Sequence, residues 1–186
     1  MRRLMWTGMV LAVFGSAACS SIQGGDHLLD REITGEVLFE SYSIDQTWTY
    51  KLSGMYIAAD GTVWEYERVG TPWYPEKLKP GELYERDILS KHKDAQQIGT
   101  VDRTLLRQMA DMIKPAARGH VARSTGSAYG NGAVDVAYLL DPTSSTYHEI
   151  ILAGYGERAA SNDAPEARML LDYLHDVQRL VHEPVQ

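Results

Sequence analysis

The sequence predicts an α+β domain: an antiparallel sheet of about five to six strands with two or three helices packed on one face. Two observations predict it. Segments rich in β-forming residues come first, a helical segment follows, and this order is repeated up to a final helix. Asp60-Gly61 lies between two β-rich segments, a signal typical of a tight hairpin because glycine accepts a positive φ. Helices on one side of a sheet are the economical packing for that order.

The first half of the domain is expected to consist mainly of strands. Residues 33–44 and 47–58 hold β-branched and aromatic residues at strand-like density. A two-residue turn at Asp60-Gly61 would pair Ile57 with Trp64. The predicted sheet therefore begins with strands that are joined by a hairpin.

The second of these segments changes its alternation part-way. Tyr50 and Leu52 are apolar on one parity, whereas Met55 and Ile57 are apolar on the other. We expect a β-bulge at Ser53-Gly54 to absorb this change. The alternative is a regular strand that is covered on both faces.

The rest of the domain is expected to alternate helices with short strands. Residues 71–81 contain three prolines and cannot form a regular element. Asp102 is placed to cap one helix, and Asp163 with Glu166 to form a capping box at the start of the last. The further elements expected are a helix around 82–93 and strands at 96–101, 119–124, 134–140 and 147–153.

Residues 1–18 predict a secretory signal. They hold two arginines, an apolar run and small residues, and they precede the single cysteine of the chain, Cys19. The apolar run is shorter than the ~20 residues that cross a bilayer core. Ser16-Ala17-Ala18-Cys19 resembles the lipobox of bacterial lipoproteins, in which the cysteine is diacylated and becomes the first residue of the mature chain. A chance cysteine beside an ordinary signal cleavage site is the alternative.

The lipoprotein resemblance implies a domain organisation and a location. It divides the chain into a signal peptide at 1–18, a polar tether at 19–31 and one globular α+β domain at 32–186. Asp after the lipidated cysteine holds proteobacterial lipoproteins at the inner membrane, so Ser20 resembles an outer-membrane destination. The implied location is the inner leaflet of the outer membrane, facing the periplasm, with attachment through the lipid on Cys19.

The charge balance limits the classes of partner. Removal of the signal with Arg2 and Arg3 would leave 16 basic and 25 acidic residues, a net charge of −9. Such a chain lacks the basic stripe that nucleic acids require and the polybasic segment that holds an anionic membrane surface. We therefore expect no nucleic-acid partner and a membrane attachment that rests on the lipid. The charge favours a basic protein partner in the envelope.

The usual motifs of catalytic and metal sites are missing from the sequence. The six histidines show no HExxH or other short metal-ligand spacing, and no cysteine other than Cys19 exists to ligate zinc. Ser90 and Lys93 have the SxxK spacing, but its SDN and KTG partner motifs are missing. We expect no metal, no cofactor and no catalytic residue. An envelope hydrolase with an unrecognised site is the alternative.

One glycine-rich segment resembles a known inhibitory loop. Residues 125–129 read Thr-Gly-Ser-Ala-Tyr and resemble the Ser-Gly-x-x-Tyr loop of periplasmic and lipid-anchored lysozyme inhibitors, with Thr in place of Ser. In that family the loop inserts into the lysozyme cleft. The resemblance implies binding roles for Gly126, Ser127 and Tyr129.

An aromatic pair is the second binding candidate. Trp73 and Tyr74 lie between Pro72 and Pro75, in a segment that strand periodicity does not bury. A stiffened, exposed aromatic pair is typical of a binding anchor. Packing of this loop onto the sheet is the alternative.

Together these patterns favour a non-catalytic, lipid-anchored binding protein of the cell envelope. A lysozyme-inhibitor-like or immunity-type protein that blocks a basic wall-degrading enzyme is one form of this hypothesis. An envelope hydrolase and a structural spacer are the alternatives from other classes.

Overall fold

The computed structural model describes residues 37–76, 79–124 and 130–183. The predicted signal peptide 1–18, the tether 19–31 with Cys19, and Gly126, Ser127 and Tyr129 lie outside the described residues. The elements in chain order are β1 (Val37–Asp45), β2 (Lys51–Ala58), β3 (Thr62–Val69), β4 (Glu82–Tyr84), α1 (Glu85–Lys91), β5 (Gln96–Thr100), α2 (Arg103–Ala116), β6 (Val121–Arg123), β7 (Asn131–Asp141), β8 (Thr146–Gly156), β9 (Ala160–Asn162) and α3 (Pro165–His182).

The strands form one antiparallel sheet, which confirms the α+β class. Its order is β5-β3-β2-β1-β7-β8-β9-β6, and β4 pairs with β8 away from this path. The sheet has nine strands, so the predicted five to six were too few. The strands that the sequence did not predict, β4 and β9, are three residues long. Segments this short show no alternation, and both exist because β8 offers them a partner.

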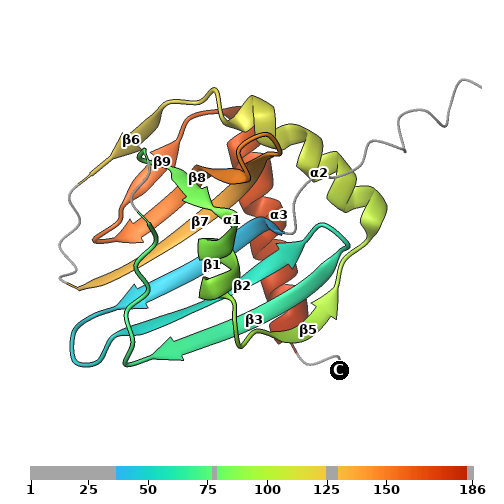
Figure 1. Ribbon diagram of the computed structural model, residues 1–186. Coiled ribbons are helices and arrows are strands. Elements are labelled where there is room, and N and C mark those ends of the chain that lie inside the picture. The colour runs from blue at the N-terminus through green and yellow to red at the C-terminus, as the bar shows by residue number, and fades with distance from the viewer. Residues whose placement is uncertain (1–36, 77–78, 125–129, 184–186) are drawn as a thin grey trace, which may run out of the picture. The chain divides into compact units, whose positions relative to one another are not determined.

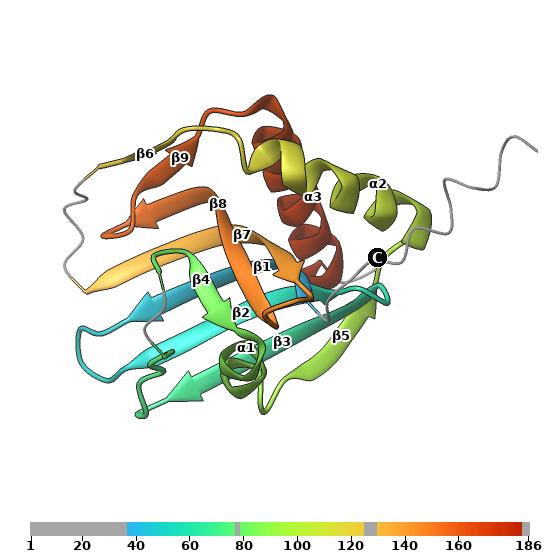
Figure 2. The same cartoon turned by 45° about the horizontal axis from the view of Figure 1, so that its top comes forward.

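Helices cover both faces of the sheet, and the prediction of a single helical face was wrong. α2 and α3 lie behind the sheet in Figure 1, whereas α1 lies in front of it, as the turned view of Figure 2 also shows. The strands present apolar side chains on both parities, so each face must be covered. The α2–α3 face buries Phe39, Ile57, Leu106, Leu170 and Leu174, and the α1 face buries Tyr42, Leu52, Tyr66, Ile88 and Tyr138.

The two-sided core explains the change of alternation in β2, where the predicted bulge at Ser53-Gly54 was wrong. β2 pairs with β1 and β3 in unbroken register from Leu52 to Ile57. Leu52 belongs to the α1 face, and Ile57 belongs to the α2–α3 face. The sequence alternative, a strand covered on both faces, is the one observed.

The hairpin between β2 and β3 forms at Asp60-Gly61, but with a different register from the predicted one. Ile57 pairs with Val63 rather than with Trp64. Gly61 has a φ of 89° and its N–H donates to the Ala58 carbonyl, 3.0 Å away. The loop therefore has three residues and ends on a left-handed glycine, a geometry that moves the pairing by one residue.

The helix caps show one success and one correction. Asp102 caps α2 as predicted, because its carboxylate accepts from the Leu105 N–H at 2.8 Å. Asp163 does not cap α3, which begins at Pro165 with Ala164 at the cap position. The Asp163 carboxylate instead accepts from the His120 N–H at 2.7 Å, a tertiary contact that competes with the local cap. None of the helices in the described part of the chain is long and apolar enough to cross a membrane.

Candidate functional site

A fully buried carboxylate, Glu40, lies at the centre of the α1 face. It is on β1, between Phe39 and Ser41, and none of its side chain is exposed. Tyr66 from β3 and Tyr138 from β7 donate their hydroxyls to its two oxygens. β7 is the direct neighbour of β1, whereas β3 lies one strand further away, beyond β2, so the long Tyr66 side chain reaches across β2 to Glu40.

α1 supplies the cations that compensate this carboxylate. Lys91 Nζ lies 2.9 Å from the Glu40 carboxylate, and His92 Nε2 lies 2.9 Å from its Oε1. Lys91, the last residue of the helix, has no exposed side-chain surface. The helix therefore carries its basic end onto the buried carboxylate of Glu40.

Aromatic rings enclose the lysine and the histidine. Lys91 Nζ lies 3.5 Å from the ring centroid of Tyr42 and 5.0 Å from that of Trp73, within the range of cation–π attraction. The His92 ring stacks on Tyr56 with centroids 4.1 Å apart. The cluster is thus an ionic core in which the Lys91 and Glu40 side chains have no exposed surface.

The charges of the cluster decide the ionisation of Glu40. Burial by itself would raise the pKa of Glu40, but the positive charges of Lys91 and His92 and the hydrogen bonds from His92 and Tyr138 outweigh it. The net result holds the pKa of Glu40 well below its usual range. Burial and the Glu40 charge raise the pKa of Tyr138 well above 10, so the tyrosine remains a hydroxyl donor.

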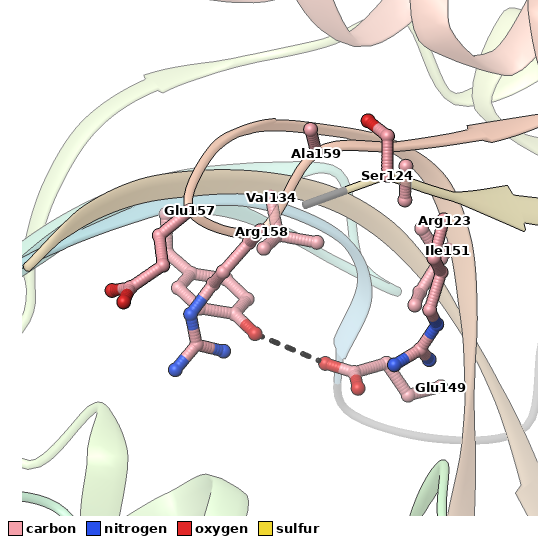
Figure 3. A pocket seen from close by; sticks show the side chains of 10 residues that line it. Arg123, Ser124, Val134, Glu149, Ile151, Glu157, Arg158 and Ala159 are labelled. Atoms are coloured by element: carbon pink, nitrogen blue, oxygen red, sulfur yellow. Dashed lines mark hydrogen bonds between the residues drawn. The ribbon is translucent and has the colours of Figure 1, made fainter. Parts of the chain in front are cut away.

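The accessible polar feature next to this core is a pocket of about 260 Å³ (Figure 3). Tyr42 connects the two, because its ring faces Lys91 and its hydroxyl donates to Glu149 Oε1 at 3.4 Å. In the view of Figure 3, the Glu149 carboxyl lies between the guanidinium groups of Arg158 and Arg123. Val134 and Ile151 provide apolar wall.

Burial raises the pKa of Glu149 above its ordinary value, and the Glu40 carboxylate adds to this effect. The positive charges of Lys91 and Arg158 and the hydrogen bond from Tyr42 oppose it without cancelling it. Glu149 therefore holds a proton to a higher pH than an exposed glutamate does.

Several loops meet at one end of the sheet, beside this pocket. We call it the loop end: residues 46–50, 70–76, 130 and 157–159. Backbone hydrogen bonds connect these segments, from Gln46 to Gly130 at 2.8 Å and from Gly70 to Tyr50 at 2.8 Å. The segments lie together at the left of Figure 1.

The two residues of the predicted aromatic pair, Trp73 and Tyr74, differ in their exposure at the loop end. The Trp73 indole is half-buried: its Nε1–H donates to the Asp87 carbonyl at 3.1 Å and its backbone N–H to the Tyr50 hydroxyl at 3.2 Å. Tyr74 is 83% exposed. Trp48, which the sequence did not single out, is 97% exposed in the neighbouring loop.

Other sequence candidates find no catalytic arrangement in the part of the chain that is described. The Ser90 hydroxyl donates to the Asp87 carbonyl at 2.9 Å, while Lys93 is exposed. No group of three histidine, cysteine or acidic side chains among the described residues is placed to hold a metal ion.

Gly126, Ser127 and Tyr129 lie outside the described residues, whereas Ser124 and Gly130, on either side of this segment, are described. Ser124 before it lines the pocket, and Gly130 after it donates to the Glu157 carboxylate at 3.2 Å. One flank of the predicted binding segment therefore lines the pocket, and the other belongs to the loop end.

Sequence reasoning missed the Glu40 cluster and the pocket. The signal for the cluster was a glutamate on the same strand parity as Tyr42 and Ile44, where an apolar residue is expected. Its partner Lys91 is 51 residues away in sequence, so no local pattern connects the two. The chain matches no known protein family, and neither a curated protein nor a solved structure resembles it significantly.

Proposed function

We propose that this chain is a non-catalytic binding protein of the cell envelope, attached to the outer membrane by lipid on Cys19 and directed at a basic protein partner. The observation that carries the proposal is the exposure of large aromatic side chains at the loop end, Trp48 at 97% and Tyr74 at 83%. Tryptophan and tyrosine are enriched among the residues that dominate binding energies.

The distribution of charge supports the same function. The net charge of −9 that remains without the signal favours association with a basic protein. The one deeply buried lysine–carboxylate pair in the described residues is closed and saturated with partners. The surface therefore offers binding groups, while the ionic core stabilises the scaffold beneath them.

An inhibitor of a basic wall-degrading enzyme is the form of this function that one further observation favours. Ser124 and Gly130, which flank the segment resembling the lysozyme-inhibitor loop, both lie beside the pocket or at the loop end. Gly130 belongs to the loop end, so this segment is continuous in sequence with the surface that exposes Trp48 and Tyr74.

The test is partner capture with the lipidated protein in cells, followed by binding measurements with the purified partner. A double variant, Trp48→Ala with Tyr74→Ala, is expected to weaken binding at least about tenfold. Leu180→Ala is the matched control, because Leu180 is 72% exposed on α3, away from the loop end. Equal loss in control and double variant, or no loss in either, would contradict the proposed surface.

The anchor has a separate test. Cys19→Ser should abolish labelling by a fatty-acid analogue and release the protein from membranes. A Cys19→Ser variant that stays labelled and membrane-bound would refute the lipoprotein assignment while leaving the binding surface to be judged by its own experiment.

A further inference from the structure

We propose that the pocket between Arg123 and Arg158 binds the carboxylate group of a small ligand. The site lies beyond the proposed function, because it recognises a small molecule and uses neither Trp48 nor Tyr74. Four observations carry the proposal: two guanidinium groups that form no ion pair with a described side chain, a carboxyl group held between them, the charge of the pocket and its size.

The arginines come from separate elements and converge on one space. Arg123 ends β6, and Arg158 lies in the turn between β8 and β9. Neither forms an ion pair or a hydrogen bond with another described side chain. The planar guanidinium fork matches a carboxylate in two-point hydrogen bonding, so two such forks provide donors on both sides of an anion.

The backbone prepares the position of Arg158. A Cβ placed on Gly132 of β7 would lie 2.9 Å from Arg158 Cγ and 3.2 Å from its Cδ. Because Gly132 has no side chain, the aliphatic part of Arg158 can lie directly over its Cα. This contact directs the guanidinium along the pocket wall rather than outward from the turn (Figure 3).

Tyr42 and Glu149 form the inner end of the pocket. Glu149 in its protonated form is an O–H donor toward a ligand, while the Tyr42 hydroxyl donates to Glu149 Oε1 at 3.4 Å and holds the carboxyl in place. The groups that face Glu149 are Lys91 from α1, Glu40 and Tyr42 from β1, and Arg158 from the β8–β9 turn. An ionised Glu149 would repel a bound anion, so protonation of Glu149 and anion binding support each other.

Charge selects a monoanion. Glu157 also lines the pocket, and its carboxylate accepts from the Gly130 N–H at 3.2 Å. With Glu149 neutral, Arg123 and Arg158 against Glu157 leave one positive charge in the pocket. One carboxylate balances this charge, whereas a phosphate dianion would leave an excess of negative charge.

The volume of the pocket favours a small ligand or the carboxyl end of a peptide chain. The volume of about 260 Å³ is below the ~300–1,000 Å³ typical of sites for drug-sized ligands. Val134 and Ile151 offer apolar wall to the carbon atoms next to the carboxylate. The pocket therefore fits a short acid or the carboxyl end of a peptide.

The test is calorimetric titration of the full chain with three probes: the dipeptide Ala-Ala, its C-terminal amide and acetate. Ala-Ala is expected to bind at least about tenfold more tightly than the amide, because the amide cannot accept charge-assisted bonds from both arginines. Comparable binding of acetate would support a free small acid as the ligand, and binding of Ala-Ala alone would support a peptide end. No binding of either acid, or equal binding of Ala-Ala and its amide, would overturn the proposal.

Variants locate the binding and separate it from protein association. Arg123→Gln and Arg158→Gln should each weaken Ala-Ala binding about tenfold, and Arg107→Gln, which removes an exposed charge from α2, should not. Glu149→Gln keeps this side chain neutral at every pH, so it should retain Ala-Ala binding and abolish its increase toward acidic pH. Unchanged affinity in both pocket arginine variants, or tighter binding of inorganic phosphate than of Ala-Ala, would overturn the assignment.

The Trp48→Ala, Tyr74→Ala double variant should bind Ala-Ala with unchanged affinity. Failure of the protein-partner experiment and failure of the dipeptide experiment are therefore distinguishable.

Discussion

Replacement of Lys91 by Met should expose how strongly the ionic core stabilises the domain. Met fills the volume of the lysine stem but removes the ammonium that lies 2.9 Å from the Glu40 carboxylate. Both side chains are completely buried. Loss of one partner from a buried ion pair typically costs about 3–5 kcal/mol, because the remaining charge has no solvent to replace it.

The free energy of unfolding, measured by urea denaturation with circular dichroism, should fall by that amount at pH 7. For a domain of this size, the loss corresponds to a decrease in melting temperature of about 6–20 °C. Folded domains retain only about 5–15 kcal/mol of stability, so Lys91→Met is expected to bring this one close to unfolding at growth temperature.

The pH dependence of stability supplies a second readout. The folded pKa of Glu40 is depressed below its ordinary value of 4.5, so the stabilisation from ionised Glu40 is complete above pH 4.5 and is lost as the pH falls below it. Without Lys91 the folded pKa of Glu40 rises toward its value in the unfolded chain, so the loss of stability that Glu40 causes below pH 4.5 should become smaller than in the unmodified protein.

A double variant, Glu40→Gln with Lys91→Met, is the matched control. It removes both charges, leaves the amide oxygen to accept from one tyrosine hydroxyl and the amide N–H to donate to the other, and should recover most of the stability that Lys91→Met loses. A loss below about 1 kcal/mol in Lys91→Met, or additive losses in the double variant, would refute the view that charge compensation holds this core.

Two further substitutions test local features. Asp102→Ala removes the cap on the Leu105 N–H and should lower the free energy of unfolding by about 1 kcal/mol in urea; Asp111→Ala, an exposed change on the same helix, should not, and equal effects would contradict the cap. Gly54→Ala would place a Cβ 2.8 Å from the Tyr66 hydroxyl, so it should cost about 1–3 kcal/mol in the same measurement. An unchanged urea midpoint would show that the sheet yields there at little cost.

Local patterns predicted the elements that are held by local interactions. The Asp102 cap, the hairpin at Asp60-Gly61 and β5 follow from residues close together in sequence. The patterns failed where a distant partner decides the outcome. β9 exists because β8 and β6 flank it.

The burial of both faces of the sheet explains why the predicted β-bulge at Ser53-Gly54 was wrong. A change of apolar parity within β2 favoured a bulge only because helices were expected on one face of the sheet. Leu52 and Ile57 are both completely buried, on opposite faces of a regular strand. The helix expected around 82–93 does form as α1, but its seven residues are too few to display an amphipathic period, so the sequence did not indicate that it covers the opposite face.

The candidate site was even less accessible to sequence reasoning. Proline punctuation drew attention to Trp73 and Tyr74, which lie at the loop end. The arginines of the pocket come from β6 and from the β8–β9 turn, and no spacing in the sequence indicates that they meet. Only the pairing of β9 with both β6 and β8 brings Arg123 and Arg158 to one pocket.

The order of the strands has a consequence for the speed of folding. β1, β2 and β3 are hairpin neighbours, as are β7, β8 and β9, but the seam between β1 and β7 joins distant parts of the chain. Across this seam the Tyr138 hydroxyl donates a hydrogen bond to Glu40, which lies 98 positions earlier in the sequence. Each half can assemble from short loops, while closure of the seam must first overcome the entropy of a long one. Seam closure is therefore expected to limit the folding rate, with relaxation in milliseconds to seconds.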